Sequence, residues 1–219
     1  MSFLKDTRLS TRILILTITS IVVILTVNYV VFVRGHSRAA QHAMVEKAAA
    51  FTAVAEEAKN HTGAIAASGA FDMEGLLADL EQTLDAGRPY TEAKIFKTIP
   101  VVAGWTAAED AAKLENINFR VTAFNARNPA REPAAESIGA TLLHQLEEQI
   151  AAGGPDTIHA VDESTNTLHY LRAIRLTSDC MMCHGQPGNQ WDTDGDGKDP
   201  LGFAMEGWSV GDVHGSYHV

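Results

Sequence analysis

Basic residues are scarce in this sequence. It has 17 Lys and Arg against 27 Asp and Glu, which gives a formal net charge of −10. Residues 1–34 carry a net charge of +3, so the remaining residues carry −13. Nucleic-acid binding depends on neutralising phosphates with basic side chains, so we expect no nucleic-acid partner. The acidic balance suits a domain that faces water outside a membrane.

Charge is absent from residues 13–33, which read ILILTITSIVVILTVNYVVFV. A helix of that length spans about 30 Å, the thickness of the hydrocarbon core of a bilayer. Basic residues precede it, so we expect residues 1–12 in the cytoplasm, although Arg34 and Arg38 weaken the asymmetry. The stretch is too long for a cleaved signal peptide and lacks a small-x-small site. We therefore expect a single-pass anchor in the inner (cytoplasmic) membrane, with the rest of the chain on the periplasmic or extracytoplasmic side.

The only two cysteines lie in the run Cys180-Met181-Met182-Cys183-His184. This pattern is typical of c-type haem attachment, in which two thiols form thioethers to the porphyrin and the histidine becomes the proximal iron ligand. Three interpretations compete. A thioredoxin-like pair needs a βαβ context, which is not found upstream; a zinc knuckle needs a second pair of ligands; and a disulfide across three positions is strained. Haem is attached on the extracytoplasmic side, in agreement with the predicted anchor.

Residues 37–67 are rich in alanine and lack proline. Positions 44, 48, 51, 55, 58 and 62 recur at helical spacing, while charged residues, Lys59 among them, occupy other faces. We expect a long helix, continuous with the anchor, whose stripe packs on the domain or pairs with a second copy in a homodimer. His61 lies at the edge of the stripe. It is either a candidate distal haem ligand or a solvent-facing histidine.

The remaining periodicity predicts an α+β protein. Its expected helices are residues 72–84, 100–116 and 136–150, with a short extended segment before Pro100. Its expected strands are residues 119–124, 157–161, 167–176, 201–205 and 213–219. The fold class is therefore an N-terminal transmembrane helix that continues into a long linking helix (residues 34–68), followed by a domain of residues 69–219 with an antiparallel sheet of four or five strands.

Four arginines have two interpretations each. Arg127 and Arg131 lie in residues 125–133 (NARNPAREP), which read as an exposed loop by composition. We expect them to be solvated, with a contact to a haem propionate as the alternative. Arg172 and Arg175 fall on opposite faces of a predicted strand. Either one pairs with a propionate or both are exposed.

An acidic loop, residues 186–200, follows the cysteines. Asp192, Asp194 and Asp196, with a glycine next, match the first half of an EF-hand loop. Position 12 of that loop is Phe203 instead of glutamate, and Asp199 and Glu206 are the nearby substitutes. One interpretation is a calcium ion held by Asp192, Asp194, Asp196 and Asp199. The other is a turn rich in Asp and Gly because these residues tolerate left-handed backbone.

Several ordered stretches resemble one known family, the Tll0287-like haem-binding domains, also called DUF3365. They are residues 97–105 (KTIPVVAGW), 119–121 (FRV), 125–133 (NARNPAREP), 179–185 (DCMMCHG), 205–208 (MEGW) and 211–215 (GDVHG). The resemblance covers roughly residues 40–219 and implies a PAS-like fold with one covalent haem, held by Cys180, Cys183 and His184. In many members the domain is the periplasmic input of a chemoreceptor, histidine kinase or cyclase; in others it stands alone.

Two features depart from the family pattern. Family members often have Arg-Pro where this chain has Arg172-Ala173, and residues 1–219 include no HAMP segment, coiled-coil signalling region or kinase. We expect either a fragment of a longer receptor or a self-contained anchored cytochrome. The expected function is the redox- or ligand-sensing input domain of a signal transducer, as in chemotaxis. The alternative is a monohaem electron-transfer cytochrome, free-standing or within a larger membrane complex. No constellation compels a peroxidase, so we expect no enzyme.

Overall fold

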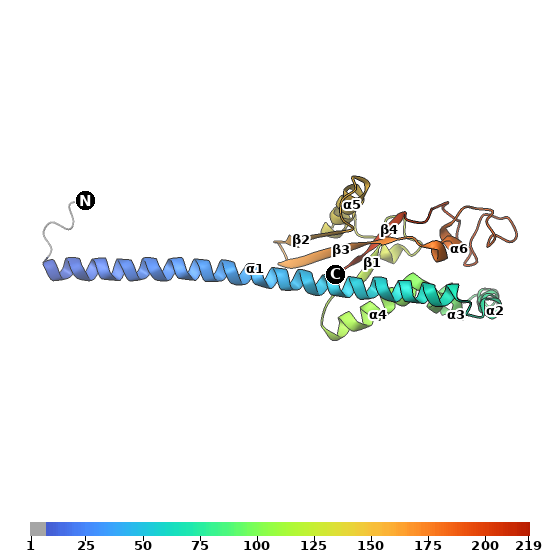
Figure 1. Cartoon of the computed structure of the whole chain (residues 1–219), viewed down its shortest axis with the longest axis horizontal. Coiled ribbons are helices and arrows are strands. Elements are labelled where there is room, and N and C mark those ends of the chain that lie inside the picture. Colours follow the sequence, from blue (N-terminus) through green and yellow to red (C-terminus); the bar gives the residue numbers. More distant parts are fainter. Residues whose placement is uncertain (1–7) are drawn as a thin grey trace. The chain divides into compact units, whose positions relative to one another are not determined.

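A computed structural model describes residues 8–219 (Figure 1). The chain divides into two compact units at Met44 and Val45. Helix α1 (Leu9–Ala67) is one continuous helix of 59 residues, as predicted. Residues 1–7 of the predicted cytoplasmic segment lie outside the described residues. In the first unit, large apolar side chains of α1 are exposed all along residues 13–33, and the helix is long and apolar enough to cross a membrane.

The second unit is built on a four-stranded antiparallel sheet. Its strands are β1 (Arg120–Thr122), β2 (Thr157–Asp162), β3 (Thr167–Arg175) and β4 (Val213–His218), in the spatial order β1-β4-β3-β2. Each neighbouring pair is antiparallel. The α+β class is thus confirmed with four strands. The strand predicted at residues 201–205 is wrong: only one isolated bridge forms there, between Lys198 and Ala204.

Helices cover both faces of this sheet (Figure 1). Helix α5 (Ile138–Ala151) begins at Ser137, whose hydroxyl accepts a hydrogen bond from the Ala140 N–H, and its leucines pack with Leu171 and Ala173 of β3. On the other face, α4 (Pro100–Leu114) and the C-terminal part of α1 pack around Phe119, Ile174 and Tyr217. Because both faces of the sheet are covered, β3 has buried side chains on both faces.

Short helices fill the remaining chain: α2 (Met73–Asp85), η1 (Tyr90–Glu92), α3 (Lys94–Thr98), η2 (Pro129–Arg131), η3 (Ser178–Cys180) and α6 (Met181–His184). The extended segment predicted before Pro100 is mostly wrong, because Ile95 is buried in a cluster with Leu80 of α2 and lies in α3. Within residues 95–99 only Ile99 is extended, since a residue before proline avoids the helical region.

The buried stripe of α1 differs from the predicted one. Its buried residues are Ala48, Thr52, Ala55, Lys59 and Gly63. Small side chains let α4 approach closely: a Cβ at Gly104 would clash with the Ala55 carbonyl. Lys59 was expected on a charged outer face, yet it is 1% exposed.

Candidate functional site

The Cys-x-x-Cys-His motif occupies a tight helical turn at the end of β3. The side chain of Thr177 caps η3, and the Cys180 thiol lies 3.4 Å from the Thr177 N–H and 3.3 Å from its hydroxyl. Helix α6 then carries Cys183 and His184 and ends at Gly185. Residues three apart on a helix share a face, so both thiols lie on one side of the turn.

His184 is oriented by a carboxylate. Its Nδ1 lies 2.9 Å from Oε2 of Glu206, and in the described part of the chain Nε2 has no hydrogen-bond partner. Burial and the nearby Arg127 lower the pKa of His184, against the opposing effect of Glu206, so the imidazole is neutral. A neutral imidazole whose other nitrogen bonds a carboxylate is the arrangement of a metal-ligating histidine.

Arg127 links the motif to two distant carboxylates. Its guanidinium donates to Glu206 Oε1 at 3.0 Å, to the Cys183 carbonyl at 2.8 Å, and to Asp199. The Arg127 side chain is only 17% exposed and that of Asp199 is fully buried, so the prediction of a solvated Arg127 is wrong. Arg131 lies over the Trp105 ring, 5.1 Å from its centroid. The composition of residues 125–133 could not reveal that Arg127 is buried, because the carboxylates that pair with it lie more than 70 positions away in the sequence.

The Cys183 thiol is chemically quiet. Burial, helped by the nearby Asp199, raises the pKa of Cys183 to about 12. Both cysteines are free, and a thiol with a raised pKa forms the reactive thiolate less readily.

Helix α1 contacts the segment that leads into the motif. Lys59 Nζ donates to the Arg175 carbonyl at 3.0 Å and lies 2.8 Å from Glu56 Oε1. A Cβ at Gly63 would lie 3.0 Å from Oδ2 of Asp179. The Tyr217 hydroxyl and Glu56 Oε2 are both buried, and neither meets the distance and angle criteria for a hydrogen bond with another of the described residues. Burial, with the charge of the nearby Glu56, raises the pKa of Tyr217.

The other candidate residues have different surroundings. His61 is exposed; on a helix it lies on the side opposite to Lys59 and Gly63, so the structure does not bring it to the motif. Its role as a distal ligand stays a prediction. Arg172 donates to Thr52 Oγ1 at 3.0 Å. Arg175 forms a two-pronged pair with Asp156, with distances of 2.8 and 2.6 Å.

Three of the four predicted calcium ligands lie together in the structure, and the fourth lies apart from them. Asp192, Asp194 and Asp196 each offer a carboxylate oxygen within 4.8 Å of the others, and they are the only such group of three or more His, Cys, Asp or Glu residues among residues 8–219. Asp199 does not belong to this group. Its carboxylate pairs with Arg127 and accepts the N–H groups of Leu201 and Phe203, both at 2.9 Å.

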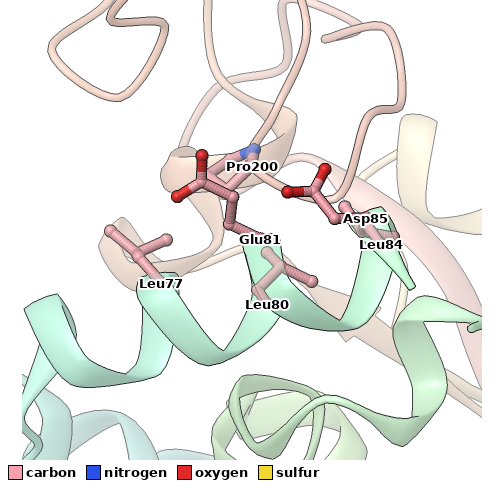
Figure 2. Close-up of a pocket in the computed structure, with 6 residues that line it drawn as sticks. All are labelled: Leu77, Leu80, Glu81, Leu84, Asp85 and Pro200. Carbon is pink, nitrogen blue, oxygen red and sulfur yellow. The ribbon is translucent and has the colours of Figure 1, made fainter. Parts of the chain in front are cut away.

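A surface groove of about 230 Å³ lies between α2 and the end of the acidic loop (Figure 2). Its lining residues are Leu77, Leu80, Glu81, Leu84, Asp85 and Pro200. The carboxylates of Glu81 and Asp85 lie beside Pro200. None of these residues belongs to the Cys-x-x-Cys-His motif, but Leu77 and Met182 of the motif both pack against the hydrophobic cluster that contains Leu80.

The fold and site together define a class: an α+β domain with a long apolar N-terminal helix and a Cys-x-x-Cys-His turn whose histidine is oriented by a carboxylate. The Tll0287-like family model (Tll0287) matches residues 37–219, and the chain belongs to this family. A solved structure, that of the cyanobacterial haem protein Tll0287, is similar at 24% identity, with a TM-score of 0.40. The match covers 52% of this chain and 66% of that one. The comparison with curated proteins found no match.

Proposed function

We propose that this chain is a c-type haem protein with one covalently bound haem. Cys180 and Cys183 would form the two thioethers and His184 Nε2 the proximal bond to iron. The haem would supply a one-electron redox centre with a further axial position. The orientation of His184 by Glu206 supports the assignment, because it leaves Nε2 free for a metal. Membership of the Tll0287-like family agrees with it.

We further propose that α1 anchors the protein in the inner membrane, with the haem domain on the extracytoplasmic side. Residues 13–33 are uncharged and apolar, and the helix continues without a break to Ala67. Haem attachment to this motif on the outer side of the membrane agrees with that orientation. A homodimer or a larger membrane complex is part of the same proposal, and no catalytic role is assigned.

The function proposed for the haem is to sense redox state or a ligand. One observation carries this choice: α1 is bonded to the segment that delivers the motif, through Lys59 and the Arg175 carbonyl. A change at the iron that moves residues 175–180 would therefore act on a helix that continues into the predicted anchor. Signal transfer requires that the two haem states favour different arrangements of such an element.

The test is hydrogen exchange on the haem-loaded full chain in detergent. We expect amide protection in residues 45–67 to differ between ferric and ferrous protein, and Lys59→Met to abolish the difference. Lys47→Met is the matched control, since Lys47 lies on the same helix and makes only an exposed pair with Glu115. Equal protection in both redox states would count against a sensor.

An electron carrier is the second candidate, favoured by the net charge of −13 outside residues 1–34. An acidic surface suits a basic redox partner. Absorption spectra separate the two: six-coordinate low-spin haem in both redox states, unaffected by carbon monoxide or nitric oxide, would exclude gas sensing and a peroxidase together and leave electron transfer or redox sensing.

A further inference from the structure

The acidic loop holds three carboxylates close together on a tightly turned backbone. Asp192, Asp194 and Asp196 occupy alternate positions, and one oxygen from each lies within 4.8 Å of the others. Gly195 and Gly197 have φ of +74° and +76°, a left-handed conformation that glycine adopts without strain. Three like charges at this separation repel one another unless a cation lies between them.

Asp192 supplies the independent observation. The residue is 8% exposed. Its Oδ2 accepts the N–H of Gly188 at 2.7 Å and that of Gly197 at 3.1 Å. Its Oδ1 is buried and has no partner in the described structure. A buried carboxylate oxygen without a donor or a cation is unfavourable, so half of this carboxylate is left for a ligand.

We propose that these three carboxylates bind a calcium ion. Calcium takes hard oxygen ligands at flexible geometry, and the spacing matches positions 1, 3 and 5 of an EF-hand loop. Position 12, which closes such a loop with a bidentate glutamate, is Phe203, and that ring packs edge-on against Tyr90 with centroids 5.2 Å apart. Water completes the coordination, which places the dissociation constant on the order of 10⁻⁴–10⁻³ M, the range of extracellular calcium modules.

Lys198 competes for one of the ligands. Its Nζ lies 2.8 Å from Oδ2 of Asp196, and this pairing lowers the pKa of Asp196. A bound ion has to share this carboxylate with the ammonium group. Removing the Lys198 charge should strengthen binding of the ion.

The site also touches the proposed haem site through both ends of the loop. Asn189 Nδ2 donates to the Met181 carbonyl at 3.1 Å, and Asp199 at the other end pairs with Arg127. An ion between Asp192 and Asp196 would fix the position of these two ends of the loop relative to each other. Calcium should therefore raise the melting temperature of the whole domain by a few degrees at saturation, as any ligand of the folded state does.

The experiment is calorimetric titration of the full chain in detergent, stripped of metal with a chelator, with CaCl₂. We expect one saturable site. Asp192→Asn, which keeps the size of the side chain, should weaken calcium binding at least tenfold, and Lys198→Met should tighten it several-fold. Asp162→Asn is the matched control: it removes one negative charge from the hairpin turn between β2 and β3, whose carboxylate accepts the Ser164 N–H at 2.9 Å, and should leave calcium binding unchanged.

A variant that binds more tightly cannot owe its behaviour to misfolding, so the Lys198→Met result keeps the test decisive. The proposal is overturned by equal calcium binding in Asp192→Asn and the parent chain, or by the absence of saturable binding up to about 10 mM CaCl₂, well above the range given for extracellular sites. The haem absorption spectrum, recorded on the same samples, reports the proposed haem site separately. A failure of calcium binding with haem intact leaves the haem proposal standing.

Discussion

The Cys-x-x-Cys-His motif and the acidic loop are neighbours in sequence but are supported in opposite ways. The motif depends on residues far away along the chain: Lys59, Arg127 and Glu206 bond to it or to the strand end before it. The aspartates of the loop bond mostly to backbone N–H groups within five positions of themselves. A contiguous motif thus identifies where a site lies, while the structural stability of that site depends on contacts with residues outside the motif.

The largest expected effect comes from Arg127→Leu. It leaves the buried Asp199 carboxylate unpaired and removes the donor to the Cys183 carbonyl, which should lower the free energy of unfolding by about 3–5 kcal/mol. Arg131→Leu is the matched control, because the Arg131 guanidinium stacks on Trp105. This variant should lower the free energy of unfolding by only about 0.5–1 kcal/mol. Chemical denaturation measures both. Similar losses for the two variants would mean that the network around Arg127 contributes no special stability.

A smaller loss is expected for Lys59→Met. The substitution keeps the length of the side chain but leaves the Arg175 carbonyl and the Glu56 carboxylate without their donor. We expect a loss of about 1–3 kcal/mol, typical of buried groups left unsatisfied, measured by chemical denaturation. Lys47→Met should change stability by less than about 1 kcal/mol, as for an exposed pair. An unchanged Lys59→Met variant would show that α1 does not hold the strand end.

Acid should weaken the support of His184. Burial raises the pKa of Glu206, but the hydrogen bonds from Arg127 and His184 and the charge of Arg127 outweigh it, so the pKa lies below the ordinary 4.5. A lowered pKa contributes stability that is fully present above pH 4.5 and is lost as pH falls through the pKa of the folded state. We expect protonation of Glu206 to lower the free energy of unfolding by an amount on the order of 1 kcal/mol.

Glu206→Gln is the variant that isolates this effect. Its stability, followed by denaturation between pH 6 and the acid transition, should fall less steeply with decreasing pH than that of the parent chain. Parallel pH profiles would assign the acid sensitivity to other carboxylates, such as Asp156, whose pKa is lowered by its pair with Arg175.

The smallest effect is expected in the acidic loop without calcium. Asp194 is exposed, and its main contact is a 3.3 Å hydrogen bond from the Asp196 N–H, which an asparagine oxygen can also accept. Asp194→Asn should therefore change stability by less than about 0.5 kcal/mol in a chelator, measured by thermal denaturation. A loss approaching that of Lys59→Met would remove the distinction between locally and remotely supported regions.

The sequence predicted features that depend on neighbours along the chain. The apolar run of residues 13–33 and the periodicity of α2, α4 and α5 led to the right elements, within a few residues at each end. It failed where distant partners decide the outcome. Lys59 looked like a surface charge because its acceptor, the Arg175 carbonyl, is 116 positions away.

The same limit explains the missed site residues. The sequence singled out Arg127 only as a loop arginine with two interpretations and Glu206 only as an acidic residue near the loop, and nothing in it says that they meet beside His184. The segment before Pro100 was predicted to be extended, yet burial of Ile95 against α2 favours a helix. Periodicity carries no information on such tertiary contacts.

The bond from Lys59 to the carbonyl of Arg175 has a consequence for how this protein can vary. Lysine here bonds to the main chain, which every amino acid possesses. Replacing Arg175 removes its pair with Asp156 but keeps the acceptor for Lys59, whereas replacing Lys59 by a residue without a long, donating side chain removes the bond itself. The bond therefore constrains the side chain at position 59 and only the backbone at position 175; what constrains the side chain at position 175 is its own pair with Asp156.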